Sequence, residues 1–256
     1  MRRTRVGLLA LFSLVALTVA VDPALAQSTA DSNTEEAIWE LNSQLLYVAV
    51  PITVLVEGIL IYTVWKFRNN ESPLPTKENR RLEITWTVAT AIILLFVGVA
   101  SYQVLAQPYV AANTADGPPT LDDGQELEEI QVIAQKYSWT FKYPGENVTT
   151  TQTMVMPTDQ PVRLNVTSRD WLHALHVPGL GLKQDAFPGQ SSYLITTATE
   201  TGTHQLYCAE YCGVGHSGML GTVEVKSQGA YQDWLDEQSP DATNESMSDM
   251  ANATSG

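Results

Sequence analysis

Basic side chains, sulfur and imidazole are all scarce in this chain of 256 residues. Its 14 Lys and Arg are outnumbered by 28 Asp and Glu, so the formal net charge at pH 7 is −14. Such an acidic chain repels a phosphate backbone, and we therefore exclude nucleic acid as a partner. The acidic excess is typical of adaptation to concentrated salt, and it is also compatible with recruitment of a basic partner.

Cysteine is the rarest residue type, with two copies, and histidine has four. No Cys-x-x-Cys-His sequence occurs, which excludes a covalently attached c-type haem. Internal repeats are absent as well, so a repeat array is excluded. Both cysteines nevertheless lie within one short segment, residues 207–219, which makes that segment the first candidate for chemistry.

The first 26 residues have the layout of a cleaved secretory signal. Three arginines lie near the start, a short apolar run follows, and Ala24-Leu25-Ala26 supplies the small residues of a cleavage site. A third membrane helix is the alternative, but the apolar run is short for one. We expect removal of residues 1–26, with Gln27 as the new N-terminus outside the cytoplasm.

Two longer apolar runs, at residues 45–65 and 86–105, each have the ~20 residues that cross a hydrocarbon layer roughly 30 Å thick. The loop between them is basic, whereas the segment from Gln27 to the first run carries acidic residues and no basic ones. By the positive-inside rule the loop is cytoplasmic and both termini lie outside. Residues 27–106 are therefore predicted to form a two-helix anchor in the cell membrane.

The residues after the anchor, 107–228, are predicted to form an extracytoplasmic domain of short strands. Val162, Leu164 and Val166 alternate with polar residues, which indicates a strand with one buried face. Several such segments separated by Gly and Pro favour a β-sandwich or a small barrel. The acidic, polar tail at residues 229–256 is predicted to be disordered.

The segment YCAEYCGVGHSGM at residues 207–219 concentrates both cysteines with one histidine and one methionine. A disulfide is the ordinary role of two cysteines in an exported domain. Cys208 and Cys212 are only four positions apart, however, so a bridge would close a very small loop and stabilise the fold little. It would also leave His216 and Met219 without a role.

As metal ligands these side chains favour copper, because thiolate and thioether are soft donors and imidazole also suits copper. A blue-copper site needs one cysteine, whereas two thiolates on one tight loop can bridge two copper ions. Zinc is the alternative metal, but it prefers a closed tetrahedron of Cys and His in which Met219 has no place. A further ligand can come from His173, His176 or His204. The first two would point to opposite faces of a strand, so both cannot serve one site.

Three motifs around these residues resemble subunit II of haem-copper cytochrome c oxidases. That family has D-x-x-H-x-x-x-V-P, then K-x-D-x-x-P-G, then C-x-E-x-C-x-x-x-H-x-x-M. The resemblance extends from the first membrane run to about residue 225, and its third motif is highly specific. The matching residues are Asp170, His173, Val177 and Pro178, then Lys183, Asp185, Pro188 and Gly189, then Cys208, Glu210, Cys212, His216 and Met219.

The resemblance implies a cupredoxin-like sandwich or barrel that carries a dinuclear copper centre, CuA. It does not determine which histidine shares a copper ion with Met219, and it leaves His176 without a ligand role. It further implies that the Glu210 side chain reaches a magnesium or manganese ion at the boundary with subunit I. The implied copper ligands are His173, Cys208, Cys212, His216, Met219 and the main-chain carbonyl of Glu210.

The family admits electrons through an aromatic strand that YSWTFKYP, at residues 137–144, resembles. In this alignment Tyr137 and Trp139 accept the electrons, with Tyr137 in the place of the family's outermost tryptophan. The alternative is that Trp139, Phe141 and Tyr143 form one buried face of a strand, because side chains two apart point the same way.

The segment RRLEITWT, at residues 80–87, resembles the start of the family's second helix. By this resemblance Glu83 lies at the mouth of a proton path into the catalytic subunit. The alternative is an ordinary charge at the membrane interface, close to Arg80 and Arg81.

The implied function is electron input to a proton-pumping cytochrome c oxidase. A cytochrome c or a blue-copper protein donates electrons to the copper pair, which passes them to haem in subunit I, where O₂ is reduced to water. The small subunit of a CuA-containing nitric oxide reductase is the alternative. Two membrane helices argue against a nitrous oxide reductase, the ligands argue against a quinol oxidase subunit, and a copper carrier rarely needs a dinuclear site with a two-helix anchor.

Overall fold

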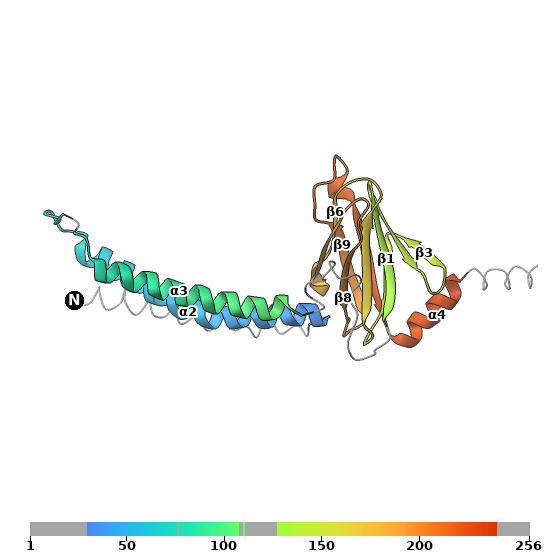
Figure 1. Cartoon of the computed structure of the whole chain (residues 1–256), viewed down its shortest axis with the longest axis horizontal. Helices are drawn as coiled ribbons and strands as arrows, with labels where there is room; N and C mark the ends of the chain where they lie inside the picture. Colours follow the sequence, from blue (N-terminus) through green and yellow to red (C-terminus); the bar gives the residue numbers. More distant parts are fainter. Residues whose placement is uncertain (1–29, 76, 108–109, 111–126, 240–256) are drawn as a thin grey trace, which may run out of the picture. The chain divides into compact units, whose positions relative to one another are not determined.

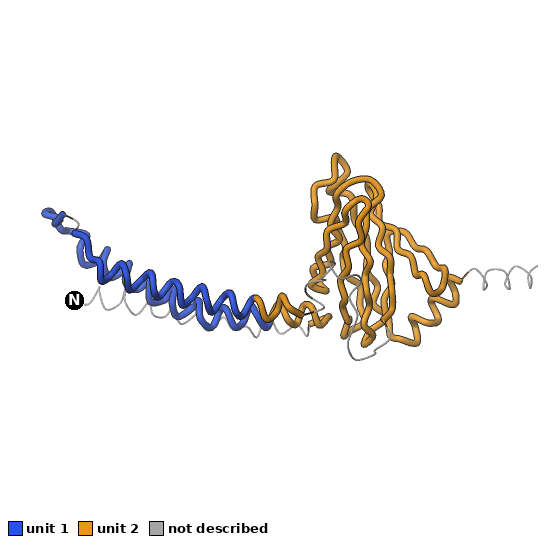
Figure 2. Tube along the Cα trace, viewed as in Figure 1, with its two compact units in different colours: residues 1–29, 40–101 blue, residues 30–39, 102–256 orange. Residues whose placement is uncertain are grey.

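The β-domain and the anchor of this chain are distinct structural units. The computed structural model divides the chain into residues 40–101 and residues 30–39 together with 102 onward (Figure 2). The predicted signal peptide and the last part of the predicted tail lie outside the described residues. The described residues are 30–75, 77–107, 110 and 127–239 (Figure 1).

Two helices among the described residues are long and apolar enough to cross a membrane. Helix α2 spans Asn33–Phe67 and helix α3 spans Arg80–Leu105. The predicted runs at residues 45–65 and 86–105 lie within them. At about 1.5 Å per residue, α2 is longer than a bilayer core requires, and its surplus lies at the N-terminal end.

The start of α2 is docked on the β-domain. The Ser32 hydroxyl donates to the Leu180 carbonyl over 2.7 Å, and the Asn33 amide donates to the Thr197 carbonyl over 3.1 Å. In return the Thr197 amide donates to Asn33 Oδ1 over 3.0 Å. Ser32 also forms an antiparallel bridge with Ala198. The first turns of this helix are therefore part of the domain's hydrogen-bond network.

The described part of the β-domain is a sandwich of two five-stranded sheets, which confirms the predicted all-β architecture. One sheet has the order β3-β2-β1-β5-β8, and the other has the order β4-β10-β9-β6-β7. The strands are β1 Glu128–Gln135, β2 Ser138–Tyr143, β3 Val148–Thr151, β4 Thr153–Pro157, β5 Val162–Ser168, β6 His173–Val177, β7 Leu182–Ala186, β8 Ser192–Thr196, β9 Gly202–Cys208 and β10 Leu220–Lys226.

The core lies between the two sheets and follows the predicted alternation. Val162, Leu164 and Val166 of β5 are fully buried, and the residues between them are half-buried. Each buried apolar side chain of this size stabilises the fold by about 1.5–3 kcal/mol relative to an exposed one. The alternation thus determines which face of β5 packs against the core.

The C-terminal residues of the described chain correct the prediction of a disordered tail from residue 229. Helix α4 spans Gln228–Gln238 and packs on the sandwich. Tyr231 and Leu235, which lie one turn apart, are buried, and the Tyr231 hydroxyl donates to Glu128 Oε1 over 2.9 Å. A short helix needs only a few apolar side chains on one face to dock, so its polar composition gave no sign of it.

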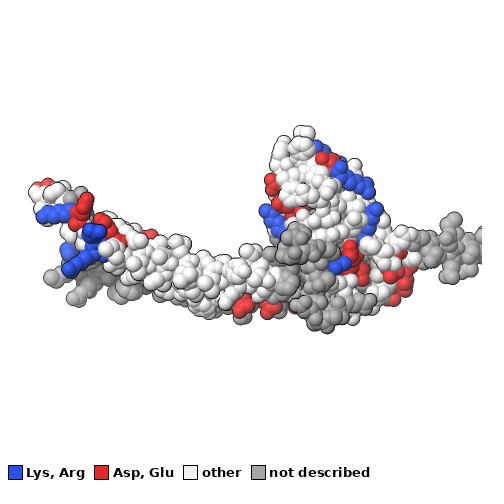
Figure 3. Space-filling model, in the orientation of Figure 1, with Lys and Arg blue, Asp and Glu red and all other residues white. Residues whose placement is uncertain are grey.

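Charge is distributed unequally between the two ends of the sandwich. At the helix end, β10 runs into α4. At the loop end, the β1–β2 turn, the β5–β6 loop and the β9–β10 loop come together. Figure 3 shows Asp and Glu side chains near α4. The acidic residues at the helix end are Glu128, Glu129, Glu146, Asp159, Glu200, Glu224, Asp233, Asp236 and Glu237.

Candidate metal centre

The cysteine-rich segment forms a loop between two neighbouring strands at the loop end. It leaves β9 at Cys208, and the Cys208 amide donates to the Met219 carbonyl over 3.0 Å, which closes the loop before β10. The Ala209 amide donates to the Ala174 carbonyl over 2.9 Å and so fixes the loop against β6. Because β6 begins at His173, this contact brings the distant histidine to the loop.

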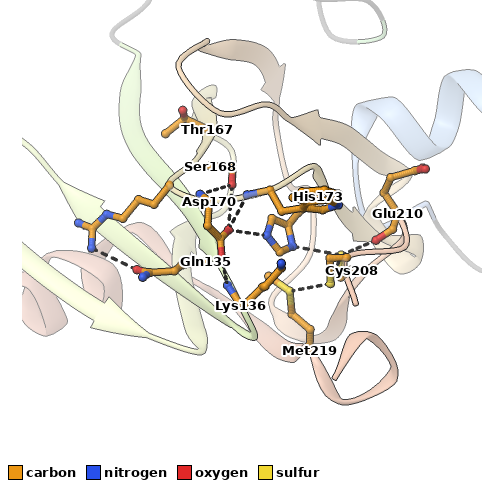
Figure 4. A network of polar contacts seen from close by, with 12 residues as sticks. Gln135, Lys136, Thr167, Ser168, Asp170, His173, Cys208, Glu210 and Met219 are labelled. Atoms are coloured by element: carbon orange, nitrogen blue, oxygen red, sulfur yellow. Dashed lines mark hydrogen bonds and ion pairs between the residues drawn. The ribbon is translucent and has the colours of Figure 1, made fainter. Parts of the chain in front are cut away.

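The predicted side-chain ligands converge on two thiols, and Figure 4 shows His173, Cys208 and Met219 of this cluster. The sulfur atoms of Cys208 and Cys212 lie 3.9 Å apart. Cys208 Sγ is 3.8 Å from His173 Nδ1, and Cys212 Sγ is 3.6 Å from His216 Nδ1. Met219 Sδ lies 3.8 Å from Cys212 Sγ. The two sulfur atoms thus lie between two imidazoles, with the thioether beside one of them.

The two cysteines are not bridged. A disulfide bond is about 2.05 Å long, far shorter than the observed 3.9 Å, and both thiols are free and buried. Burial raises the pKa of the Cys212 thiol to about 11, and the neighbouring Cys208 thiol contributes in the same direction. A metal ion that binds Cys212 at neutral pH must therefore displace a proton from it.

The Asp170 carboxylate holds the His173 ring on the side away from the thiols. Figure 4 shows this ring between Asp170 and Cys208, with Nε2 2.9 Å from Asp170 Oδ1. Asp170 also accepts hydrogen bonds from the amides of Lys136 and Trp171, over 2.9 and 2.8 Å. Partial burial alone would raise the pKa of Asp170, but these hydrogen bonds outweigh it and lower the pKa below its usual value. The carboxylate is therefore ionised at neutral pH and fixes the ring with Nδ1 toward the sulfur.

Glu210 presents its main-chain oxygen to the same cluster. The Cys208 thiol donates to the Glu210 carbonyl over 3.2 Å. Figure 4 shows the Glu210 side chain directed away from Cys208. The carbonyl is thus placed as the resemblance implies, and the carboxylate faces out of the cluster. Its binding of magnesium or manganese stays a prediction.

The other two histidines do not join the cluster. His176 Nδ1 lies 2.8 Å from the Leu182 carbonyl, and its ring contacts Tyr207 edge-on. His204 has a side chain only 10% exposed and lies 3.8 Å from Asp31, near the start of α2. Of the three candidates that the sequence left open, only His173 reaches the thiols.

One of the two predicted electron-accepting residues is inaccessible. Trp139 is fully buried, and its ring meets the His173 ring edge-on with centroids 6.4 Å apart. Phe141 and Tyr143 are buried on the same face of β2, which confirms the alternative of a buried strand face. A donor protein therefore cannot contact Trp139 directly, and the role of Trp139 in electron entry stays a prediction.

Tyr137 is half-buried and packs against the main chain of the cysteine loop. A Cβ at Gly213 would lie 2.7 Å from the Tyr137 hydroxyl, and one at Gly215 would lie 2.5 Å from its ring. Any larger residue at these positions would displace the ring or the loop. This contact was not predicted from the sequence. The signal for it was the Gly-x-Gly sequence between the predicted ligands Cys212 and His216, because paired glycines allow a close approach of another side chain.

The donor set fits copper. Two thiols, two imidazole nitrogens, a thioether and a carbonyl oxygen surround one buried site, and a thioether ligand is typical of copper rather than zinc. Met219 is fully buried, and its sulfur lies within this cluster rather than at the surface. The ligand atoms of His173, Cys208 and Cys212 all lie within 4.8 Å of one another, which is close enough to hold metal.

Glu83 is exposed in the first turn of α3, where its amide donates to the Asn79 carbonyl over 3.0 Å. This position agrees with the helix start that the sequence indicates. Its role at a proton path involves another subunit and stays a prediction.

Comparison with known proteins matches both parts of the chain. The family model "Cytochrome C oxidase subunit II, transmembrane domain" matches residues 10–104, and "Cytochrome C oxidase subunit II, periplasmic domain" matches residues 141–226. Cytochrome c oxidase subunit 2 of Synechocystis is 29% identical over 259 residues, covering 86% of this chain and 76% of the relative. The Cereibacter sphaeroides subunit is 27% identical over 241 residues, covering 77% and 74%.

A solved structure resembles the β-domain. It is the periplasmic domain of subunit II of cytochrome oxidase from Bradyrhizobium japonicum, with a TM-score of 0.43 and 24% identity over 47% of this chain and 95% of that one. The sandwich and the two apolar helices agree with the expected all-β domain and its two-helix anchor. The two family models together match well over half of the chain. The chain therefore belongs to the cytochrome c oxidase subunit II family, a membrane-anchored component of terminal oxidases.

Proposed function

We propose that this chain is the electron-input subunit of a proton-pumping cytochrome c oxidase and that its loop end holds a dinuclear copper centre. The observation that carries the proposal is the pair of free, buried thiols 3.9 Å apart, each within 3.8 Å of an imidazole Nδ1. A mononuclear blue-copper site needs only one cysteine, so the second thiol is surplus there. Two thiols between two imidazoles provide two sets of ligands that share both sulfur atoms.

The proposed ligands are His173, Cys208, Cys212, His216, Met219 and the Glu210 carbonyl. When bound there, the copper pair accepts and releases one electron at a time. The chain's own contribution is a rigid cage. Hydrogen bonds close the loop at Cys208 and Met219 and fix it against β6, Asp170 holds the His173 ring, and four of the five proposed side-chain ligands are buried. A cage that does not move between redox states keeps the reorganisation energy of electron transfer low.

The remaining assignments concern the rest of the complex. We infer that the β-domain lies on the extracytoplasmic side of the cell membrane, because the loop between α2 and α3 is the basic one. The electrons leave toward haem in subunit I. Glu210 reaches magnesium or manganese through its side chain, and Glu83 lies at the mouth of a proton path. The α2–α3 anchor supports the assembly with other oxidase subunits.

Metal content and electron paramagnetic resonance test the proposal. The purified full chain in detergent, loaded with copper, should bind two copper ions and show hyperfine splitting from two equivalent nuclei. Cys208→Ser should abolish this signal or convert it to that of a single copper. One copper ion per chain, or a disulfide between Cys208 and Cys212 in active preparations, would contradict the proposal. Identification of the co-purifying catalytic subunit distinguishes an oxidase from a nitric oxide reductase.

A further inference from the structure

A small exposed surface at the loop end combines aromatic, aliphatic and basic side chains. Its members come from three loops that meet beside the metal centre. Trp171 is 55% exposed and Val214 is 99% exposed, Lys136 and Arg169 are exposed, and Tyr137 is half-buried. We call Lys136, Tyr137, Arg169, Trp171 and Val214 the docking patch.

The loops that carry the docking patch are joined by several contacts. The Lys136 ammonium lies over the Trp171 ring, 4.8 Å from its centroid. The Arg169 amide donates to the Ala134 carbonyl over 3.0 Å, which joins the β5–β6 loop to the end of β1. Val214 lies between the two glycines whose main chain packs on Tyr137. The patch is thus one ordered surface.

The docking patch is connected to the proposed copper ligands by two short routes. Through the main chain, the Lys136 amide donates to Asp170, whose other oxygen holds His173. Through packing, the Tyr137 ring lies against the loop between Cys212 and His216. An electron that arrives at this surface is therefore within a few contacts of the metal site.

The charge of the docking patch is opposite to that of the chain. Lys136 and Arg169 are positive, and the one carboxylate of the adjacent loop, Asp170, is engaged by His173 and two main-chain amides. Of the twelve Asp and Glu in residues 127–239, nine lie at the helix end. Two further carboxylates at the loop end, Asp185 on β7 and Glu210 on the cysteine loop, are half-buried and lie outside the patch, whose own charged side chains are the two cations.

We propose that the docking patch receives a small redox protein whose contact face is apolar around its redox centre and flanked by carboxylates. Trp171 and Val214 supply the apolar contact, Lys136 and Arg169 pair with the carboxylates, and Tyr137 lies between this face and the copper ligands. The donor loses one electron and the copper centre gains it. The inference rests on the proposed function and adds the charge and surface chemistry of the donor. The overall composition was compatible with a basic partner, whereas the docking patch favours an acidic one.

The test uses the intact oxidase complex and two donor proteins of opposite charge. We would measure the second-order rate of copper reduction by stopped flow with an acidic blue-copper protein, plastocyanin, and with a basic cytochrome c. Lys136→Glu combined with Arg169→Glu should lower the rate with plastocyanin about tenfold at low salt. The matched control is Lys142→Glu combined with Lys226→Glu, which makes the same charge change toward the helix end and should leave that rate unchanged.

Salt dependence tests the charged part of the docking patch, and an uncharged substitution tests its apolar part. Added salt should slow plastocyanin with the natural chain and remove its difference from the charge-reversed variant. Trp171→Ala should lower the rate at low and high salt alike, and Trp171→Phe should restore much of it.

Three results would overturn the inference: faster reduction by cytochrome c than by plastocyanin, equal effects of the two charge reversals, or no effect of Trp171→Ala. Every variant is first checked for the dinuclear copper signal. If the natural chain lacks that signal, the proposed function itself fails. If the signal is intact and the rates do not respond to the patch, only the docking inference fails.

Discussion

The hydrogen bond between Asp170 and His173 should set the strength of copper binding. Asp170→Asn keeps one oxygen for His173, but its NH₂ group then faces a main-chain amide that also donates. Loss of a carboxylate behind a ligating histidine typically lowers metal affinity 10–100-fold, which corresponds to about 1.4–2.8 kcal/mol. Because the asparagine retains one acceptor, we expect about tenfold for Asp170→Asn and about 100-fold for Asp170→Ala.

The measurement is a competition titration of the full chain against a copper chelator of known affinity, together with a potentiometric titration. Removal of the carboxylate's negative charge should raise the reduction potential, because that charge stabilises the more positive, oxidised metal. Asp159→Asn is the matched control. It makes the same charge change at the helix end, at a left-handed φ of 58° that asparagine tolerates. Unchanged affinity and potential in Asp170→Asn would refute the positioning role of this residue.

Three further changes test other parts of the structure. Gly215→Ala should disturb the copper spectrum, because its Cβ would lie 2.5 Å from the Tyr137 ring; a natural spectrum would show that the ring can move aside. Tyr231→Phe should cost about 1 kcal/mol through the lost hydrogen bond to Glu128, and thermal denaturation that matches the natural chain would count against this contact. Glu83→Ala should slow proton uptake by the oxidase with an unaltered copper spectrum, whereas unchanged turnover would remove Glu83 from the mechanism.

The residues of the metal centre were largely predictable from the sequence because most of them lie on one short loop. Sulfur and imidazole at such close spacing are typical of a metal site. The loop also joins two adjacent strands, so its two ends and the ligands on it are held close together. The choice of His173 from three candidates needed the family resemblance, since it depends on a contact between β6 and the loop. The hydrogen bond that Asp170 accepts from His173 was missed because it requires the path of the β5–β6 loop, which no periodicity encodes.

What the sequence could not decide lies in patterns that fit two structures equally well. Alternation of aromatic residues at Trp139, Phe141 and Tyr143 fits either an exposed or a buried strand face, and only the packing of the second sheet decides between them. The turn between β1 and β2 falls at Lys136 and Tyr137, and it contains no Gly or Pro that would mark it in the sequence. Helix α4 escaped notice because its few apolar residues were outweighed by acidic ones.

The docked beginning of α2 has a practical consequence for shortened forms of this protein. A soluble fragment that starts after α3, at residue 107, would lose the partners of the Leu180 carbonyl and of the Thr197 amide and carbonyl, and would uncover the surface around Gly181, which now contacts Glu35 and Ile38. Such a fragment would bring new polar and apolar groups into contact with water and would be prone to aggregate. Fusion of residues 30–39 ahead of the fragment would restore these contacts.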